Sequence, residues 1–181
     1  TAFDVASLAV QVFGGHGYVH DAGIEQYVRD SRVFAIYEGT SGIQSLDLLT
    51  RKILRDGGTR YRLLTDVMRA DMALHETNPK LMVLVTALDE ALGRMDECTR
   101  WLQQRVAARP RDAEWAATDY LQLMGLVAGA WMWLRMAAAA DSSSDEDQQR
   151  HLLARFYCNW LLPQSFVHEA RIRLGSDVAT R

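Results

Sequence analysis

The chain has 181 residues, of which 49% are hydrophobic and 24% are charged. This balance is typical of a globular protein and excludes an intrinsically disordered chain. The net charge of −3, with no run of basic residues, argues against a dedicated nucleic-acid-binding protein. The two cysteines lack CxxC spacing, so we expect them to be reduced and the protein to be cytoplasmic.

The longest uncharged apolar run, Leu123–Leu134, has about 12 residues and is shorter than the ~20 that cross a bilayer. We therefore expect no membrane span. The sequence starts at Thr1 within an apolar helical pattern, and for this reason we expect it to be a piece of a longer protein.

Short helical patterns and glycine-rich turns alternate in the first part of the chain. Apolar residues at helical spacing predict a buried helix over Phe3–Phe13, which the three glycines within Gly14–Gly17 end. A second short helix is predicted over Ile24–Ser31. The apolar run Val33–Tyr37 that follows it could be either a strand or a helix.

A further helix is predicted after Gly39. Ser41 and Gln44 have the spacing of a capping box, in which each side chain bonds the backbone near the other. The apolar stripe of this helix continues to Ile53, and the pair Gly57-Gly58 ends it.

From Thr59 onward the pattern changes to long amphipathic helices with short connections, which is typical of an antiparallel bundle. One connection contains the serines at positions 142–144, and Pro163 should kink the last helix. We therefore expect an all-α chain with two parts, residues 1–58 and 59–181. The predicted long helices cover residues 60–77, 80–108, 111–140 and 145–174.

Glu38 is the candidate general base. It follows an apolar run and precedes Gly39. Because a carboxylate among apolar neighbours is costly to ionise, its pKa should rise toward values that suit a general base. From these residues alone the simpler alternative is an exposed glutamate that the dipole of the next helix favours.

Three segments in fixed order resemble the C-terminal domain of acyl-CoA dehydrogenases. They are QVFGGHGY at residues 11–18, YVRDSR at 27–32 and IYEGTSGIQ at 36–44, and the resemblance covers about residues 1–55. A weaker similarity, at residues 155–164, is to the C-terminal helical extension of larger members, which include dehydrogenases of 3-methylthiopropanoyl-CoA. The resemblance implies the end of a four-helix bundle followed by an antiparallel helical extension.

The chemistry that the resemblance implies is oxidation of acyl-CoA thioesters to trans-2-enoyl-CoA by bound FAD. Glu38 would be the base that removes the α-proton, and Gly39 would lie against the substrate. Gly42 stands where many relatives carry a polar side chain, so it offers only backbone. The implied FAD-binding residues, of which the first five would contact the FAD of a neighbouring subunit, are Gln11, Val12, Phe13, Gly14, Gly15, Thr40, Ser41 and Gly42.

The resemblance also implies an acyl-CoA substrate, an electron-transfer flavoprotein as acceptor, and a homodimer or larger homo-oligomer. We expect no metal site, because His16 and His20 have no third ligand at useful spacing. The alternatives are an acyl-CoA oxidase, a family member without turnover that acts as a binding or protective protein, and a helical interaction module after Thr59. The 181-residue chain alone should be inactive and flavin-free.

Overall fold

The structure, a computed structural model, describes residues 2–140 and 144–179. Every regular element in these two ranges is helical and no strand occurs in them, which confirms the prediction of an all-α chain. The chain forms two compact units, Thr1–Gln44 and Ser45–Arg181, here called the N-terminal and C-terminal units.

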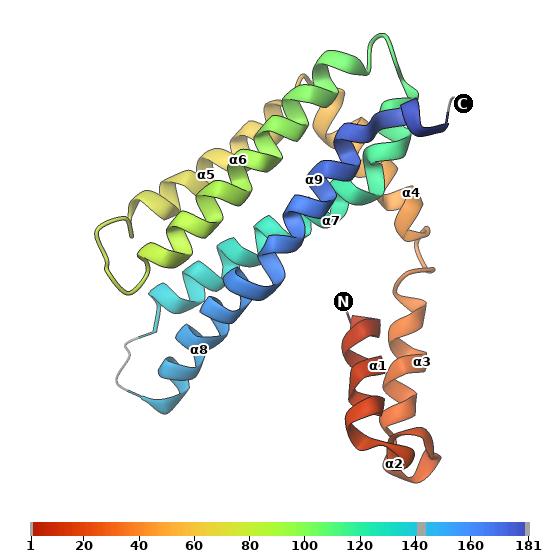
Figure 1. Cartoon of the computed structure of the whole chain (residues 1–181), viewed down its shortest axis with the longest axis vertical. Helices are drawn as coiled ribbons and strands as arrows, with labels where there is room; N and C mark the ends of the chain where they lie inside the picture. The colour runs from red at the N-terminus through yellow and green to blue at the C-terminus, as the bar shows by residue number, and fades with distance from the viewer. Residues whose placement is uncertain (1, 141–143, 180–181) are drawn as a thin grey trace. The chain divides into compact units, whose positions relative to one another are not determined.

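An antiparallel pair of helices makes up most of the N-terminal unit (Figure 1). The helices α1 (Ala2–Phe13) and α3 (Ile24–Val33) pack against each other, in agreement with the sequence. They are joined through the one-turn helix α2 (Gly15–Tyr18) and the 3-10 turn η1 (His20–Ala22). The residues after Val33 are neither strand nor helix but form a hydrogen-bonded turn.

The prediction that the first helix is buried is wrong for the described chain. In α1 only Ala6 is buried, whereas Val12 is 84% exposed and Leu8 is 65% exposed. The reason is that α3 covers a single side of α1, so the remaining apolar stripe meets no side chain of its own unit.

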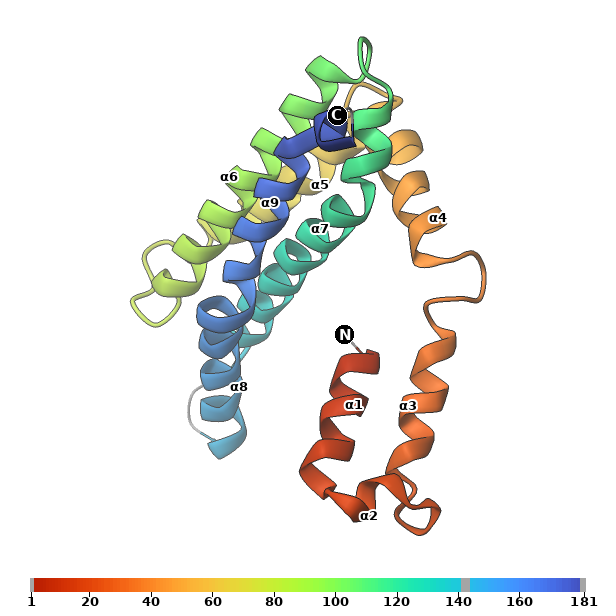
Figure 2. The same ribbon diagram turned by 45° about the vertical axis from the view of Figure 1, so that its right-hand side comes forward.

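Antiparallel helices with short connections build the C-terminal unit, as the apolar pattern predicts (Figure 2). Helix α4 starts at the end of the N-terminal unit and continues into a π-helical stretch, η2, whose wider turns the sequence did not predict. The elements are α4 (Ser41–Leu46), η2 (Asp47–Leu54), α5 (Thr59–Ala73), α6 (Met82–Arg105), α7 (Arg111–Ala138), α8 (Asp145–Phe156) and α9 (Ser165–Leu174).

The kink expected at Pro163 is confirmed. A π-helical turn, η3 (Tyr157–Leu161), and a 3-10 turn, η4 (Leu162–Gln164), separate α8 from α9. Proline has no amide hydrogen to donate, so the regular ladder of hydrogen bonds cannot pass through it. Ser144 caps the start of α8 by accepting a hydrogen bond from Asp147 N at 3.2 Å, whereas Ser142 and Ser143 lie outside the described residues.

Helix α7 is the centre of the C-terminal unit, because it packs against α6, α8, α9 and η2. Its side chains Leu123, Val127 and Leu134 are fully buried. Among the described helices α7 alone is long and apolar enough to cross a membrane by length and composition. A core helix of a bundle can meet the same criteria, but packing covers α7 only in part, since 28% of its apolar window is buried. The expectation of no membrane span therefore stays a prediction.

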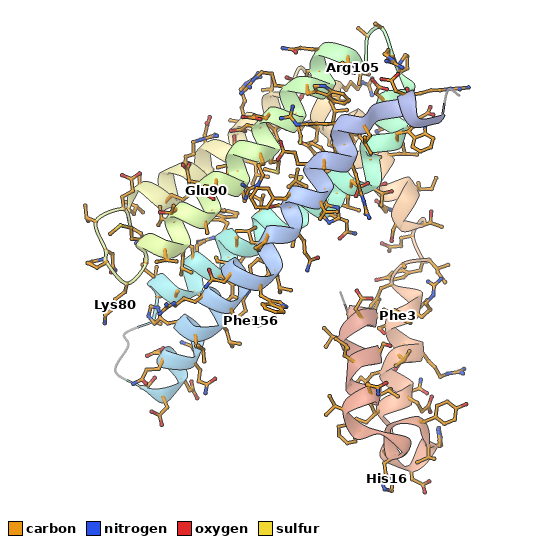
Figure 3. All side chains as sticks on the ribbon, viewed as in Figure 1. Phe3, His16, Lys80, Glu90, Arg105 and Phe156 are labelled. Carbon is orange, nitrogen blue, oxygen red and sulfur yellow. The ribbon has the colours of Figure 1, made fainter. Side chains whose placement is uncertain are left out.

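A buried carboxylate joins three elements at the C-terminal end of the described chain. Asp112, at the start of α7, accepts hydrogen bonds from the Ser176 amide and hydroxyl at 2.9 and 2.6 Å and from Arg105 Nε at 2.8 Å. Arg105 ends α6, and Ser176 lies in the final 3-10 turn, η5 (Gly175–Ala179) (Figure 3). Burial alone would raise the pKa of Asp112, but these hydrogen bonds outweigh it and lower the pKa to about 2.

Asp112→Asn should lower the free energy of unfolding of the C-terminal unit by about 1.5–3 kcal/mol, because the charged hydrogen bond between Arg105 and Asp112 is lost while the ion pair of Arg105 with Asp177 remains. All five tryptophans lie in this unit, so urea unfolding followed by tryptophan fluorescence measures it. The control is Asp66→Asn, which changes the same charge at an exposed position of α5. A loss under ~1 kcal/mol, as for an exposed ion pair, would contradict the role of Asp112.

The same carboxylate predicts a pH dependence. Its pKa in the folded chain is lower than its ordinary value of 3.8, so the ionised form favours folding. The contribution is therefore complete above about pH 4 and is lost as the pH falls toward 2. We expect the difference in stability between the wild type and Asp112→Asn to shrink over this range, and a constant difference would contradict the assignment.

Candidate functional site

The site residues predicted from the sequence lie in two segments of the chain, at opposite ends of the α1–α3 pair. Gln11–Gly15 covers the end of α1 and the start of α2. Glu38–Gly42 covers the loop after α3 and the first turn of α4. Figure 3 labels Phe3 and His16 at the two ends of the α1–α2 arm, and the glycine segment is at the His16 end. The structure therefore does not bring the two segments together within one chain.

The backbone of Glu38 is unusual. Its φ angle of 55° makes it the one residue other than glycine with a positive φ in the described chain. Gly39 follows with a φ of 97°. A side chain in this left-handed region costs about 1–3 kcal/mol and persists only where neighbouring contacts hold it, which occurs often at functional sites.

Backbone hydrogen bonds shape the turn that leads to Glu38. The amides of Ile36 and Tyr37 both donate to Val33 O, at 2.9 and 3.1 Å. On the other side of Glu38, Ser41 N donates to Ala35 O at 3.3 Å and closes the loop. The amide hydrogen of Glu38 has no acceptor among the described residues.

The predicted capping box is wrong by one residue. Thr40 and not Ser41 caps α4, because Thr40 Oγ1 accepts from Ile43 N at 3.4 Å. The residue three positions after the cap is then Ile43, so Gln44 cannot complete a capping box. Its side chain instead reaches the preceding loop, where Gln44 Nε2 donates to Glu38 O at 2.6 Å. Sequence reasoning missed this contact.

The prediction that apolar neighbours desolvate Glu38 is also wrong for the described chain. Glu38 is exposed, and its neighbours Ile36 and Tyr37 are each 52% exposed. These side chains lie in a projecting turn, where they point to solvent rather than form a pocket around the carboxylate. The carboxylate is therefore accessible to another molecule.

The glycine segment combines an open backbone with an adjacent cleft. Gln11 lines an open cleft of about 600 Å³ together with Arg29, His20 and Glu25. Within it, His20 Nδ1 lies 2.7 Å from Glu25 Oε1. Sequence reasoning did not predict this cleft, because its polar residues come from three different elements. Val12 and Phe13 beside it are exposed.

The glycines of this segment have different structural roles. Gly14 has a φ of 59°, and Gly17 packs so tightly that a Cβ there would lie 2.7 Å from Val10 O. At Gly15 a Cβ would meet no atom within 4 Å, and its φ is not positive. The fold of the chain therefore does not require glycine at position 15, and the Gly15 backbone is open to a ligand.

Other chemistry has little support in the described part of the chain. No group of three histidine, cysteine or acidic residues in residues 2–140 and 144–179 could hold a metal ion. Cys98 and Cys158 are buried and free, and burial raises the pKa of their thiols to about 12 and about 11. Both thiols therefore stay protonated at neutral pH and are poor nucleophiles.

Two family models match the sequence. The model described as acyl-CoA dehydrogenase, C-terminal domain, matches residues 1–54, which include all the predicted site residues. The model described as acetyl-CoA dehydrogenase C-terminal like matches residues 64–181.

Curated relatives are dehydrogenases of acyl-CoA. A 3-methylmercaptopropionyl-CoA dehydrogenase of Ruegeria pomeroyi is 34% identical over 142 residues, which are 78% of this chain and 24% of the relative. A broad-specificity linear acyl-CoA dehydrogenase of Mycobacterium tuberculosis is 30% identical over 76% of this chain and 23% of its own length. A short-chain-specific acyl-CoA dehydrogenase of Clostridium acetobutylicum is 48% identical over 54 residues, 30% of this chain and 14% of the relative. The chain thus spans about a quarter of the length of the first two relatives.

Gly17→Ala should destabilise the N-terminal unit by about 1–3 kcal/mol, because the new methyl group overlaps Val10 O and Phe13 Cβ. Gly15→Ala is the matched control, since the same methyl group there enters open space. Amide hydrogen exchange of α1 and α3, followed by mass spectrometry, measures the effect. Equal exchange in the two variants would contradict the close packing at Gly17.

Proposed function

The chain belongs to the acyl-CoA dehydrogenase family, and we propose that it is the C-terminal part of an FAD-dependent enzyme that oxidises acyl-CoA thioesters to trans-2-enoyl-CoA. The observation that carries the proposal is the left-handed backbone of Glu38, a strained glutamate within the segment that the family model matches. Residues 1–58 would end the flavin-binding helical domain, and residues 59–181 would form the helical extension. The two model matches, which end at residue 54 and start at residue 64, support this division.

Glu38 is the proposed base. The α-proton of a thioester is weakly acidic, so its removal needs an aligned carboxylate and stabilisation of the charge that develops on the thioester oxygen. The exposed carboxylate of Glu38 can reach another molecule, and its amide hydrogen, which has no acceptor among the described residues, can donate to the thioester oxygen. The rest of the enzyme would supply the walls that exclude water around Glu38.

The two predicted FAD segments fit a cofactor in different ways. The open backbone of Gly14 and Gly15 permits close approach of a ligand, and Val12 and Phe13 are exposed beside Gln11. The Thr40 hydroxyl and the backbone of Ser41 and Gly42 lie next to Glu38. When bound, FAD accepts the hydride that leaves the β-carbon of the substrate.

The distance between the two segments supports a homo-oligomer. Gln11–Gly15 and Thr40–Gly42 lie at opposite ends of the α1–α3 pair, an arrangement that fits contributions from one chain to two different FAD molecules (Figure 1). We further propose an electron-transfer flavoprotein as the acceptor and a cytoplasmic location, which the free cysteines support.

Glu38→Gln in the full-length enzyme should slow flavin reduction by acyl-CoA by at least about 10²–10⁴-fold, because the amide cannot take up the α-proton. The flavin content should not change, since Glu38 holds no cofactor in this proposal. Stopped-flow bleaching of the flavin measures the rate, with Glu76→Gln on the exposed surface after α5 as the control. A rate within about tenfold of the wild type would exclude Glu38 as the base.

Gly15→Val in the full-length enzyme should lower the FAD content after gel filtration. A Cβ at position 15 would meet no atom within 4 Å, and its φ is not positive, so the helices should stay folded. Circular dichroism verifies the fold, and the ratio of flavin to protein absorbance measures the content. Full flavin occupancy in a folded variant would show that the Gly15 backbone does not approach the cofactor.

A further inference from the structure

The side chain of Gln44 crosses from α4 back to the loop that carries Glu38. Gln44 Nε2 donates to Glu38 O at 2.6 Å, a bond between residues six positions apart. A carbonyl oxygen can only accept, so a side-chain donor is needed at this point. Among the described residues no other side chain bonds the backbone of Glu38.

The bond acts on the least favourable backbone conformation in the described chain. With a φ of 55°, Glu38 would relax toward a right-handed or extended conformation if nothing held it. Such a rotation swings the Cα–Cβ bond and moves the carboxylate away from its present position. The backbone bonds of the turn end at Tyr37 on one side and start again at Thr40 on the other. Gln44 therefore bridges the interval that contains Glu38.

The backbone of Gln44 is held in α4, and its side chain is exposed. Its backbone amide donates to Thr40 O at 3.0 Å, within the capped first turn of α4. The side chain passes directly beside Gly39, where a Cβ would lie 3.4 Å from Gln44 Nε2 and 3.5 Å from Ile43 Cγ2. The absence of a side chain at Gly39 leaves the path of the amide open.

We propose that Gln44 is a positioning residue for the base: its amide fixes the carbonyl of Glu38 and thereby the direction of the carboxylate. This inference rests on the proposed role of Glu38 in α-proton removal. It adds a residue that has no contact with the reacting atoms and acts only through the backbone of its neighbour.

The test uses the full-length enzyme with FAD and the variant Gln44→Met, which keeps the length of the side chain and removes the donor. The rate constant of flavin reduction by acyl-CoA should fall by about 10- to 100-fold, the size of effect that misplacement of a catalytic group causes. The flavin content and the Kd for acyl-CoA should not change. The control is Gln26→Met, which removes an equivalent bond, from Gln26 Nε2 to Asp30 Oδ1 at 2.7 Å, on α3.

Rate constant and amplitude separate the possible roles of Gln44. A merely structural role would reduce the amplitude of flavin bleaching, because less enzyme would be folded, and would leave the rate constant unchanged. Either that result or a wild-type rate constant in Gln44→Met would overturn the positioning role of Gln44. The proposed base would still stand in that case if Glu38→Gln slowed flavin reduction by about 10²-fold or more. If Glu38→Gln itself retained the wild-type rate, the proposed base would be wrong and the role of Gln44 with it.

Discussion

At Glu38 the backbone has a φ of 55°, and the geometry of the candidate site follows from the contacts that hold it there. Helix α3 ends at Val33, whose carbonyl accepts two amides of the turn, and α4 starts at Ser41 under the cap of Thr40. Between these two helix ends the backbone passes through the left-handed pair of Glu38 and Gly39. A flexible loop would point the side chain in many directions, whereas a defined backbone at Glu38 fixes the direction of its Cα–Cβ bond.

The C-terminal unit contrasts with this exposed loop. Its central helix α7 packs against α6, α8, α9 and η2, and its polar contacts join these helices. Asp112 joins α6, α7 and the final 3-10 turn, and Tyr61 donates to Asp96 at 2.6 Å between α5 and α6. Among the described residues of this unit, none other than glycine has a positive φ like that of Glu38.

Local features of this chain were predictable because neighbouring residues determine them. The glycines after Phe13 and the break at Pro163 depend on backbone chemistry that a few letters reveal. Asp112 and Ser176 are 64 residues apart, and no local pattern predicts that they meet. The contact of Gln44 with Glu38 depends on a left-handed turn that the sequence does not specify. The burial of α1 and Glu38 depends on what packs around them, which composition cannot tell.

The central claim is that the carboxylate of Glu38 takes the α-proton of an acyl-CoA thioester. An experimental structure of the full-length enzyme with FAD and an unreactive acyl-CoA analogue tests it most directly. We expect a carboxylate oxygen of Glu38 about 3–3.5 Å from the α-carbon of the analogue, with the left-handed backbone retained. Another carboxylate at the α-carbon, with Glu38 turned to solvent, would exclude Glu38 as the base.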